Sequence, residues 1–323
     1  MTKVLVTREI PEEGRKKLEK DMEVVVNTAD RPITKEELQE GLQDADALYC
    51  MLVDKIDREV LEAAPRLKVI ANMAVGVDNI DLEACTEKGI VVTNTPGVLT
   101  DATADLAWAL LLAVSRCIVE GDRYVRDEKF NGWAPLLLVG GDLKGMNLGI
   151  IGMGRIGQAV ARRGLGFGMN ILYYQRNRLF EEEERELEAT YLPLDDLVRQ
   201  ADYLTLHLPY YPEVHHIING ERLQMMKSTA YLINTARGAH VDERALVKCL
   251  QEGVIAGAGL DVYEREPHLA PGLVELNNVV LAPHTGSATA WTRRTMALMS
   301  AESIVKVLKG EKPDYVVNSQ VYK

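Results

Sequence analysis

The stretch NLGIIGMGRIGQAVARR, residues 147–163, places an apolar run directly before three spaced glycines and a helical pattern. The glycines are Gly152, Gly154 and Gly157. In such an order the first glycine allows a tight turn, the second lets the backbone approach a pyrophosphate, and the third lets helix and strand pack closely. Amides at the start of the helix would face the phosphates. The stretch therefore predicts a strand, a dinucleotide-binding turn and a helix, a stronger signal than the glycines alone.

Short β-rich runs alternate with helix-length segments on both sides of this motif, which is the pattern of parallel sheets built from βαβ units. The first series of runs is KVLVT (3–7), EVVVN (23–27), ALYCML (47–52), LKVIANM (67–73) and GIVVTN (89–94). The second is NLGIIG (147–152), NILYYQ (170–175), DYLTLHL (202–208), AYLINTA (230–236), AGAGLDV (256–262) and NVVLAPH (278–284). We predict an α/β protein with two doubly wound parallel sheets.

Two helical patterns suggest how the two series are connected. One is apolar almost all round its middle, and we predict a single buried helix from Thr103 to about Val125 that links two domains. The other, residues 290–309, follows the last strand and is expected to pack back on the first domain. We therefore predict a flavodoxin-like substrate domain, residues 1–98 and 288–323, with a Rossmann dinucleotide-binding domain, residues 99–287, inserted in it.

Composition excludes several classes of function. The 323 residues are 47% apolar and 26% charged, with 48 acidic and 37 basic side chains and a net charge of -11. No basic cluster interleaves with aromatic residues, so we expect no nucleic-acid ligand. The N-terminal residues lack the features of a secretory signal, and the longest apolar stretch, residues 106–114, is far below the roughly 20 residues of a membrane helix. We expect a cytoplasmic protein without membrane contact.

The four cysteines form no CxxC pair. They are Cys50, Cys85, Cys117 and Cys249. Their wide spacing indicates neither a disulfide framework nor a zinc site, so we expect buried thiols and no metal.

The end of the strand after the glycine motif bears on the choice of cofactor. Gln175 lies 18 residues after Gly157, where an NAD site usually has an acid that binds the ribose 2′-OH. Arg176 and Arg178 follow it and could donate charge-assisted hydrogen bonds to a 2′-phosphate. The sequence therefore favours NADP(H), with NAD(H) still possible. The alternative is that the two arginines belong to a solvated loop.

Three strands of the second series are followed by a polar residue suited to acting on a 2-oxo acid: Arg237, Glu266 and His284. Because ligands of parallel sheets bind at the carboxyl ends of the strands, these residues are expected to converge. Histidine can donate a proton near neutral pH, and a neighbouring carboxylate would favour the imidazolium. Arginine offers a planar fork to a carboxylate. Each has an ordinary structural explanation when taken singly.

A second anion site is suggested where the run LKVIANM meets Val75 and Gly76. Successive backbone amides in such a turn can bind an anion, and a substrate carboxylate is the candidate. The alternative is an ordinary turn with Gly76 at positive φ.

Several blocks together resemble the D-isomer-specific 2-hydroxyacid dehydrogenase family, in its glyoxylate/hydroxypyruvate reductase branch. The blocks cover most of the chain in order: NMAVGVDNIDLEAC (72–85), NTPGVLTDATADLAWALLL (94–112), LGIIGMGRIGQAVARR (148–163), INTARGAHVDERAL (233–246), AGAGLDVYEREP (256–267) and LAPHTGSAT (281–289).

The resemblance implies an NAD(P)H-dependent reduction of glyoxylate, hydroxypyruvate or both to the D-2-hydroxy acid, with His284 as proton donor and Arg237 and Glu266 as its catalytic partners. It implies that the amides of Val75 and Gly76 bind the substrate carboxylate. The implied cofactor-binding residues are Gly152, Gly154, Arg155, Ile156, Gly157, Gln175, Arg176, Asn177, Arg178, Thr235, Ala236, Arg237, Asp261, His284, Gly286 and Thr103. Finally, it implies a homodimer in which Trp133 of one copy contributes to the substrate site of the other.

Relatives with other activities stay open as alternatives. Phosphite, D-lactate and phosphoglycerate dehydrogenases resemble this core, although the common long phosphoglycerate enzymes add a regulatory domain. A formate dehydrogenase would pair the histidine with glutamine instead of Glu266. From another class of protein, corepressors use the same fold as a dinucleotide-sensing binding module, and fold alone cannot separate a sensor from an enzyme.

Overall fold

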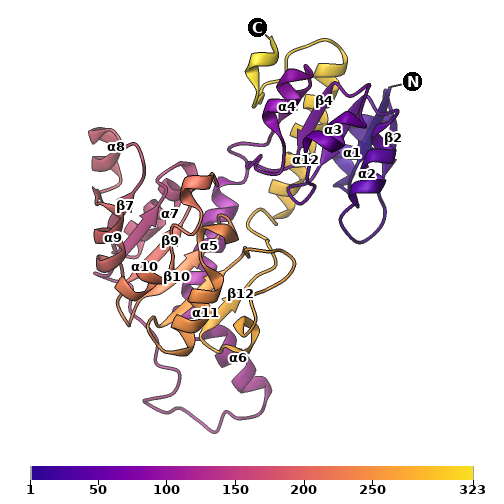
Figure 1. The fold of residues 1–323 in the computed structure, drawn as a ribbon. Coiled ribbons are helices and arrows are strands. Elements are labelled where there is room, and N and C mark those ends of the chain that lie inside the picture. Colours follow the sequence, from indigo (N-terminus) through magenta and orange to yellow (C-terminus); the bar gives the residue numbers. More distant parts are fainter. Residues whose placement is uncertain (1, 323) are drawn as a thin grey trace. The chain divides into compact units, whose positions relative to one another are not determined.

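The structure is a computed structural model that describes residues 2–322, and the chain divides into two compact units (Figure 1). One comprises Met1–Leu99 with Ser287–Lys323, and the other Thr100–Gly286. Each change from one unit to the other lies one residue from the boundary expected from the sequence. The first unit is thus discontinuous in sequence, with the second inserted in it.

The first unit is a five-stranded parallel sheet in the order β2-β1-β3-β4-β5, the order of flavodoxin-like folds. Its strands are β1 (Lys3–Val6), β2 (Glu23–Val26), β3 (Ala47–Cys50), β4 (Val69–Asn72) and β5 (Val91–Thr93). Its helices are α1 (Glu12–Glu19), α2 (Lys35–Leu42), α3 (Arg58–Glu62), α4 (Leu82–Glu87) and α12 (Ala290–Leu308), with a final 3-10 turn η4 (Ser319–Tyr322).

Alternation along the strands covers both faces of this sheet. In β1, Val4 and Val6 join the apolar cluster that contains Ile304 of α12, whereas Leu5 joins the cluster that contains Leu38 of α2. Successive strand side chains point to opposite faces, so this alternation buries the sheet between helices on its two sides. Helix α12 packs against α1 and β4, which confirms that the C-terminal helix returns to the first unit (Figure 1).

The second unit is a seven-stranded parallel sheet in the order β12-β11-β10-β9-β6-β7-β8. The strands are β6 (Asn147–Ile151), β7 (Asn170–Tyr174), β8 (Ala189–Tyr191), β9 (Tyr203–Leu206), β10 (Tyr231–Asn234), β11 (Gly257–Leu260) and β12 (Val279–Leu281). The helices are α5 (Thr100–Ser115), α6 (Ile118–Arg126), α7 (Arg155–Gly166), α8 (Glu181–Glu186), α9 (Leu194–Gln200), α10 (Gly220–Met225) and α11 (Glu243–Gln251), with 3-10 turns η1 (Pro212–Val214), η2 (Gly238–His240) and η3 (Leu273–Glu275). The strand order changes direction between β6 and β9, the position at which Rossmann sheets bind dinucleotides. The predicted fold class, two doubly wound parallel sheets, is confirmed.

Strand β8 was not expected from the sequence, which indicated six strands in this unit. Its three residues, Ala-Thr-Tyr, pair with β7 at the edge of the sheet, and Thr190 is exposed. So short a run has too few buried apolar positions to produce a recognisable pattern.

The single helix expected from Thr103 to about Val125 is wrong: α5 and α6 are separate helices bent by 60°. Cys117, between them, has a φ of 52°. A left-handed residue cannot continue a right-handed helix, so the chain turns at this point. Because no glycine or proline occurs there, the sequence carried no sign of the break. Helix α5 has buried residues along its length, whereas no residue of α6 is buried.

Within residues 2–322, no single helix is long and apolar enough to cross a membrane, although α5 and α6 pass that test when they are taken together. The apolar residues of α5 belong to the core of the second unit, where Leu110 and Leu111 lie in one buried cluster with Ile150 of β6. All four cysteines are free thiols, and three of them are buried.

Candidate active site

The glycine motif occupies the turn between β6 and α7, and each glycine has a different reason for lacking a side chain. Gly152 has a φ of 94°, and a Cβ there would lie 2.7 Å from the carbonyl carbon of His207. A Cβ on Gly157 would lie 2.1 Å from the carbonyl oxygen of Gly152. A Cβ on Gly154, the residue before α7, would meet nothing within 4 Å. The open backbone at Gly154 leaves room for a pyrophosphate at the start of the helix.

Replacement of Gly157 by alanine should disrupt this turn. The added methyl group cannot fit 2.1 Å from a backbone oxygen, so the turn or the helix must move. Overpacking of this kind costs roughly 1–3 kcal/mol, and we expect a lower Tm together with weaker dinucleotide binding. Calorimetric titration with the reduced dinucleotide and thermal unfolding would measure both effects.

Gly166→Ala is the matched control, because Gly166 ends the same helix and a Cβ there meets nothing within 4 Å. We expect this variant to bind the dinucleotide like the wild type. Wild-type binding and Tm in Gly157→Ala would show that the turn does not depend on the close approach of helix and strand.

The loop after β7 carries the residues expected to contact the cofactor, and these residues have different surroundings in the structure. The Oε1 atom of Gln175 accepts a hydrogen bond of 3.1 Å from the amide of Met153, so Gln175 braces the glycine turn. The guanidinium of Arg176 lies over the ring of Tyr211, 5.6 Å from its centre. Asn177 is exposed in the same loop. Arg155 and Ile156 begin α7 directly after Gly154.

Arg178 already has an internal partner. Its Nε and Nη2 atoms donate hydrogen bonds of 2.7 and 2.8 Å to the two carboxylate oxygens of Glu184 in α8. The Tyr173 hydroxyl donates to the same carboxylate. The hydrogen bond from Arg178, assisted by that of Tyr173, outweighs burial and holds the pKa of Glu184 below its ordinary value. Two donors of Arg178 are therefore engaged within the protein, whereas the contact of Arg176 within residues 2–322 is with the aromatic ring of Tyr211.

A buried hydroxyl lies at the end of β10. Thr235 is 9% exposed, and its Oγ1 atom has no hydrogen-bond partner among the described residues. Asn234 shapes the turn around it: its Oδ1 accepts from the amide of Ala236 at 3.0 Å, and its Nδ2 donates to the carbonyl of Arg237 at 2.8 Å. Buried hydroxyls normally have a partner, so the orphan at Thr235 fits a site that a polar ligand completes. Together with the open backbone at Gly154, it fits a bound dinucleotide.

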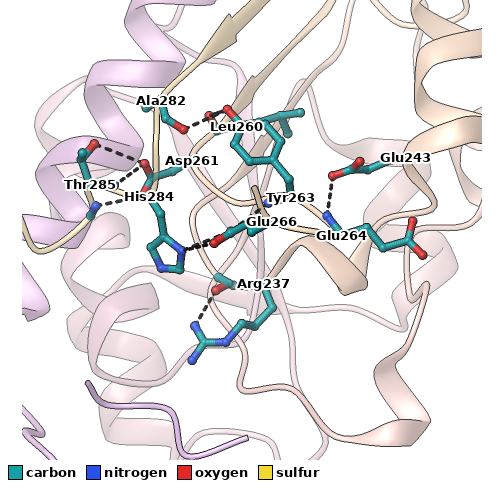
Figure 2. Close-up of polar contacts among 12 residues, drawn as sticks. Arg237, Glu243, Leu260, Asp261, Tyr263, Glu264, Glu266, Ala282, His284 and Thr285 are labelled. Carbon is teal, nitrogen blue, oxygen red and sulfur yellow. Dashed lines mark hydrogen bonds and ion pairs between the residues drawn. The ribbon is translucent and has the colours of Figure 1, made fainter. Parts of the chain in front are cut away.

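His284 and Glu266 form a hydrogen-bonded pair and lie in the segments that follow β12 and β11 (Figure 2). The Nδ1 atom of His284 lies 2.8 and 3.1 Å from the carboxylate oxygens of Glu266, and each side chain is 25% exposed. With Nδ1 donating to the carboxylate, Nε2 is the ring nitrogen left for a substrate. The backbone of His284 has a φ of 55° and is held by its amide, which donates to the Asp261 carbonyl at 2.9 Å.

Glu266 is ionised more readily than an isolated carboxylic acid. Burial raises its pKa, but the hydrogen bond and charge of His284, the amide of Tyr263 and the charge of Arg237 lower it by more. The Tyr263 amide donates to Oε1 at 3.1 Å. The carboxylate therefore keeps its negative charge at neutral pH and faces the histidine with it.

Arg237 follows β10, and Figure 2 shows its side chain near the histidine and glutamate pair. Its Nη1 atom donates to the carbonyl of Ala236 at 2.8 Å. The next residue fixes this turn, because a Cβ on Gly238 would lie 1.9 Å from the carbonyl carbon of Tyr263. The turn that carries Arg237 is thus packed directly on the segment that leads to Glu266. The second unit therefore brings together all three residues expected to be catalytic.

Asp261 organises the turn after His284. Its carboxylate accepts from the amides of Thr285 at 2.7 Å and Gly286 at 2.8 Å, and burial raises its pKa despite these donors. Thr103 of α5 donates to the carbonyl of Gly286 at 3.2 Å. Thr103, Asp261 and Gly286 thus lie together in the turn after His284, and the hydrogen bonds to Asp261 fix the main chain. Their predicted contacts with the cofactor stay a prediction.

The turn at Val75 and Gly76 belongs to the first unit and follows β4. Gly76 does not have a positive φ, so the alternative of a left-handed turn is not what the structure has. Two asparagines hold this turn: Asn94 Nδ2 donates to the Val75 carbonyl and Asn72 Nδ2 to the Gly76 carbonyl, both at 2.8 Å. The sequence pattern did not identify these asparagines, although Asn72 ends an otherwise apolar strand and is fully buried. Binding of a carboxylate by the two amides stays a prediction.

Trp133 lies in the segment after α6, and its side chain is 85% exposed. Within one copy of the chain it therefore covers little of the protein. Its predicted place in a neighbouring copy's site stays a prediction.

Comparisons with known proteins agree with this geometry. The sequence model of the family described as D-isomer specific 2-hydroxyacid dehydrogenase, NAD binding domain, matches residues 108–286. A glyoxylate reductase from Pyrococcus horikoshii is 53% identical over 99% of this chain and 97% of its own length. The crystal structure of a protein from Thermus thermophilus superposes with a TM-score of 0.92 at 48% identity, covering 98% of this chain and 100% of that one.

A further solved structure is that of an NADPH-dependent glyoxylate/hydroxypyruvate reductase from Sinorhizobium meliloti, in complex with NADP and malonate. It has a TM-score of 0.85 at 32% identity and covers 99% of this chain and 97% of that one. The family model, the identity over the full length and the fold all agree with the meeting of a histidine, a glutamate and an arginine in the second unit. The chain therefore belongs to the D-isomer-specific 2-hydroxyacid dehydrogenase family, in its glyoxylate reductase branch.

Proposed function

We propose that this chain reduces glyoxylate, hydroxypyruvate or both to the D-2-hydroxy acid with a reduced nicotinamide dinucleotide. The observation that carries the proposal is the His284 and Glu266 pair beside Arg237, at the carboxyl edge of a sheet whose glycine turn fits a dinucleotide. Relatives named glyoxylate reductase, about half identical over nearly the whole chain, support the choice of substrate.

Each residue has a proposed role that follows from its chemistry. When bound, the reduced nicotinamide supplies the hydride. His284 gives the proton from Nε2 to the carbonyl oxygen of the substrate, while Glu266 holds the ring at Nδ1 and faces it with negative charge. Arg237 presents a planar fork that fits the substrate carboxylate and favours negative charge on the adjacent carbonyl oxygen. The amides of Val75 and Gly76 are proposed as further donors to the carboxylate.

Initial rates of NADPH and NADH oxidation with glyoxylate, hydroxypyruvate, pyruvate and phosphonooxypyruvate test this function. We expect rapid oxidation with glyoxylate or hydroxypyruvate. These two differ by one hydroxymethyl group, which a pocket discriminates by only about 1–3 kcal/mol, so measurable turnover of both is expected. Absence of turnover with every 2-oxo acid would exclude the reductase function and leave a dinucleotide-sensing role to be tested by partner binding.

We also propose that NADPH is the preferred cofactor and that Arg176 is the main residue that binds its 2′-phosphate. Position 175 is a glutamine and not the acidic residue that would bind a ribose 2′-OH. Arg176 lies in the same loop. Arg178 is the weaker candidate, because Glu184 engages two of its donors. The Sinorhizobium meliloti relative is described as NADPH-dependent, in agreement with this choice.

Alanine at both Arg176 and Arg178 should raise the KM for NADPH far more than the KM for NADH. A hydrogen bond to a charged group contributes about 1.5–3 kcal/mol, so the ratio of kcat/KM values for the two cofactors should fall at least about tenfold. The single change at Arg176 should account for most of the loss. Equal increases in the KM values for NADPH and NADH would show that neither arginine binds the phosphate.

We further propose that two copies associate through the segment that begins at α6. Large apolar side chains there are exposed: Phe130 is 55% exposed, Trp133 85%, Leu136 87% and Val139 70%. Clustered exposure of this kind is unusual for a surface that contacts only water, and a second copy is the partner that the family resemblance favours. Trp133 would then reach the site of the other copy.

Leu136→Glu should weaken this association, because it places a charge within an apolar interface. Sedimentation velocity should show a dimer for the wild type and a shift toward monomer for the variant. Val274→Glu, a substitution at an exposed apolar residue elsewhere in the unit, is the control that should stay dimeric. A monomeric wild type would overturn the proposal.

A further inference from the structure

A group of three potential metal ligands lies outside the catalytic residues. His215 and His216 follow η1, in the connection after β9, and Glu264 lies in the segment after β11. One ring nitrogen of each histidine and one carboxylate oxygen of Glu264 all lie within 4.8 Å of one another. The two imidazole rings stack with their centres 3.9 Å apart, and the Nε2 atom of His216 lies 3.2 Å from Oε1 of Glu264.

Main-chain contacts position two of the three residues, His216 and Glu264. His216 has a φ of 49°, and its amide donates to the carbonyl of Ala239 at 2.8 Å. The amide of Glu264 donates to the buried carboxylate of Glu243 at 2.6 Å (Figure 2). These contacts use the amides of His216 and Glu264, so the imidazole and carboxylate groups are left to face one another.

The side chains are sheltered but accessible. His216 is 29% exposed and Glu264 23%, while His215 lies at the surface, where the hydroxyl of Tyr210 is 3.3 Å from its Nδ1 atom. An ion from solvent can therefore reach the group. Because the two imidazole rings are stacked, at least one of them must rotate out of the stack for both to bind the same ion.

We propose that His215, His216 and Glu264 bind a divalent transition-metal ion of the zinc type. Two imidazoles and a carboxylate are a common ligand set for zinc, with water as the fourth ligand. Bonds of about 2.0–2.1 Å in a tetrahedral site bring ligand atoms to roughly 3.4 Å from one another, so rotations of the three side chains would close the site. The ligands are mainly nitrogen, which favours zinc, cobalt or nickel over magnesium or calcium.

The bound ion would link two connections of the second unit. One follows β9; the other follows β11 and carries Glu266 two residues after Glu264. An ion that binds only the folded chain stabilises it in proportion to the logarithm of its concentration over Kd. We therefore expect zinc at a hundredfold excess over Kd to raise the Tm by roughly 5 °C.

The test is calorimetric titration of zinc chloride into the untagged, full-length protein after treatment with EDTA. We expect saturable binding of one ion per chain, and a visible absorption spectrum of nitrogen-coordinated cobalt when Co²⁺ replaces zinc. His215→Ala, His216→Ala and Glu264→Gln should each weaken zinc binding by at least about tenfold, because loss of a mere hydrogen-bond partner of a metal ligand already costs about 10- to 100-fold in affinity. His215→Ala is the decisive variant, because its side chain is at the surface and we therefore expect its removal to leave the fold intact.

His268→Ala is the matched control, since His268 is an exposed histidine in the same connection as Glu264. We expect it to bind zinc like the wild type. Two results would overturn the proposal: absence of saturable binding in the wild type, or unchanged binding in His215→Ala. If His284→Ala abolished the binding that His215→Ala retained, the ion would lie at the catalytic pair instead.

Discussion

Replacing His284 by alanine is expected to lower kcat with glyoxylate by about 100- to 10,000-fold, the usual contribution of a positioned general acid. Its Nδ1 atom is 2.8 Å from Glu266, so the ring is oriented with Nε2 available to the substrate. Alanine removes the proton donor but leaves the glycine turn of β6 and α7 untouched. Steady-state rates and calorimetric binding of NADPH, measured on the same preparation, would separate loss of catalysis from loss of cofactor binding.

The control is His268→Ala, which removes an exposed histidine without touching the catalytic pair. It should keep wild-type rates. A near-normal kcat in His284→Ala would remove this residue from the mechanism and direct attention to another proton donor.

Replacing Arg237 by alanine is expected to lower kcat/KM for the 2-oxo acid by roughly 100- to 1,000-fold, comparable to the loss of one preorganised donor to a developing oxyanion. Its guanidinium is placed beside the His284 and Glu266 pair by a turn that Asn234 braces. The KM for the 2-oxo acid should rise and kcat should fall, because the arginine acts on the substrate carboxylate and on the reacting carbonyl. Arg237→Lys should recover only a small part, since an ammonium cannot make the planar two-point contact.

Arg244→Ala provides the control for Arg237, because Arg244 is exposed on α11, seven residues further along the chain. We expect normal rates from it. If Arg237→Ala lowered affinity for NADPH as strongly as it lowered turnover, the arginine would belong to the dinucleotide site and not to the substrate site.

The order of elements along the chain was largely readable from sequence. Strands of a parallel sheet produce short apolar runs, and eleven such runs mark the strands other than β8. The roles of Gly152 and Gly157 were also readable, because steric limits on a Cβ in this turn apply wherever the strand, turn and helix occur in that order. Convergence of Arg237, Glu266 and His284 followed from the topology of a parallel sheet, whose carboxyl ends share one edge.

Other features depend on contacts between residues far apart in sequence. The bend at Cys117 has no local glycine or proline to mark it, and Asn72 and Asn94 act on Val75 and Gly76 through side-chain amides. The sequence predicts that Arg178 binds a phosphate, whereas in the structure Glu184 accepts hydrogen bonds from two of its donors. A pattern of residue types cannot reveal whether a charge is already paired.

The proposed metal site is another feature that the sequence pattern did not predict. His216 and Glu264 are 48 positions apart, and His215 and His216 are adjacent, so their spacing matches no recognised ligand motif. Sequence by itself determined the α/β class, the glycine turn and the three polar residues that meet after the strands, because local periodicity and the rules of parallel sheets fix these features. Only the tertiary structure decided which donors are engaged, where the linking helix bends and which distant side chains meet, because those outcomes depend on packing between segments that the order of residues does not state.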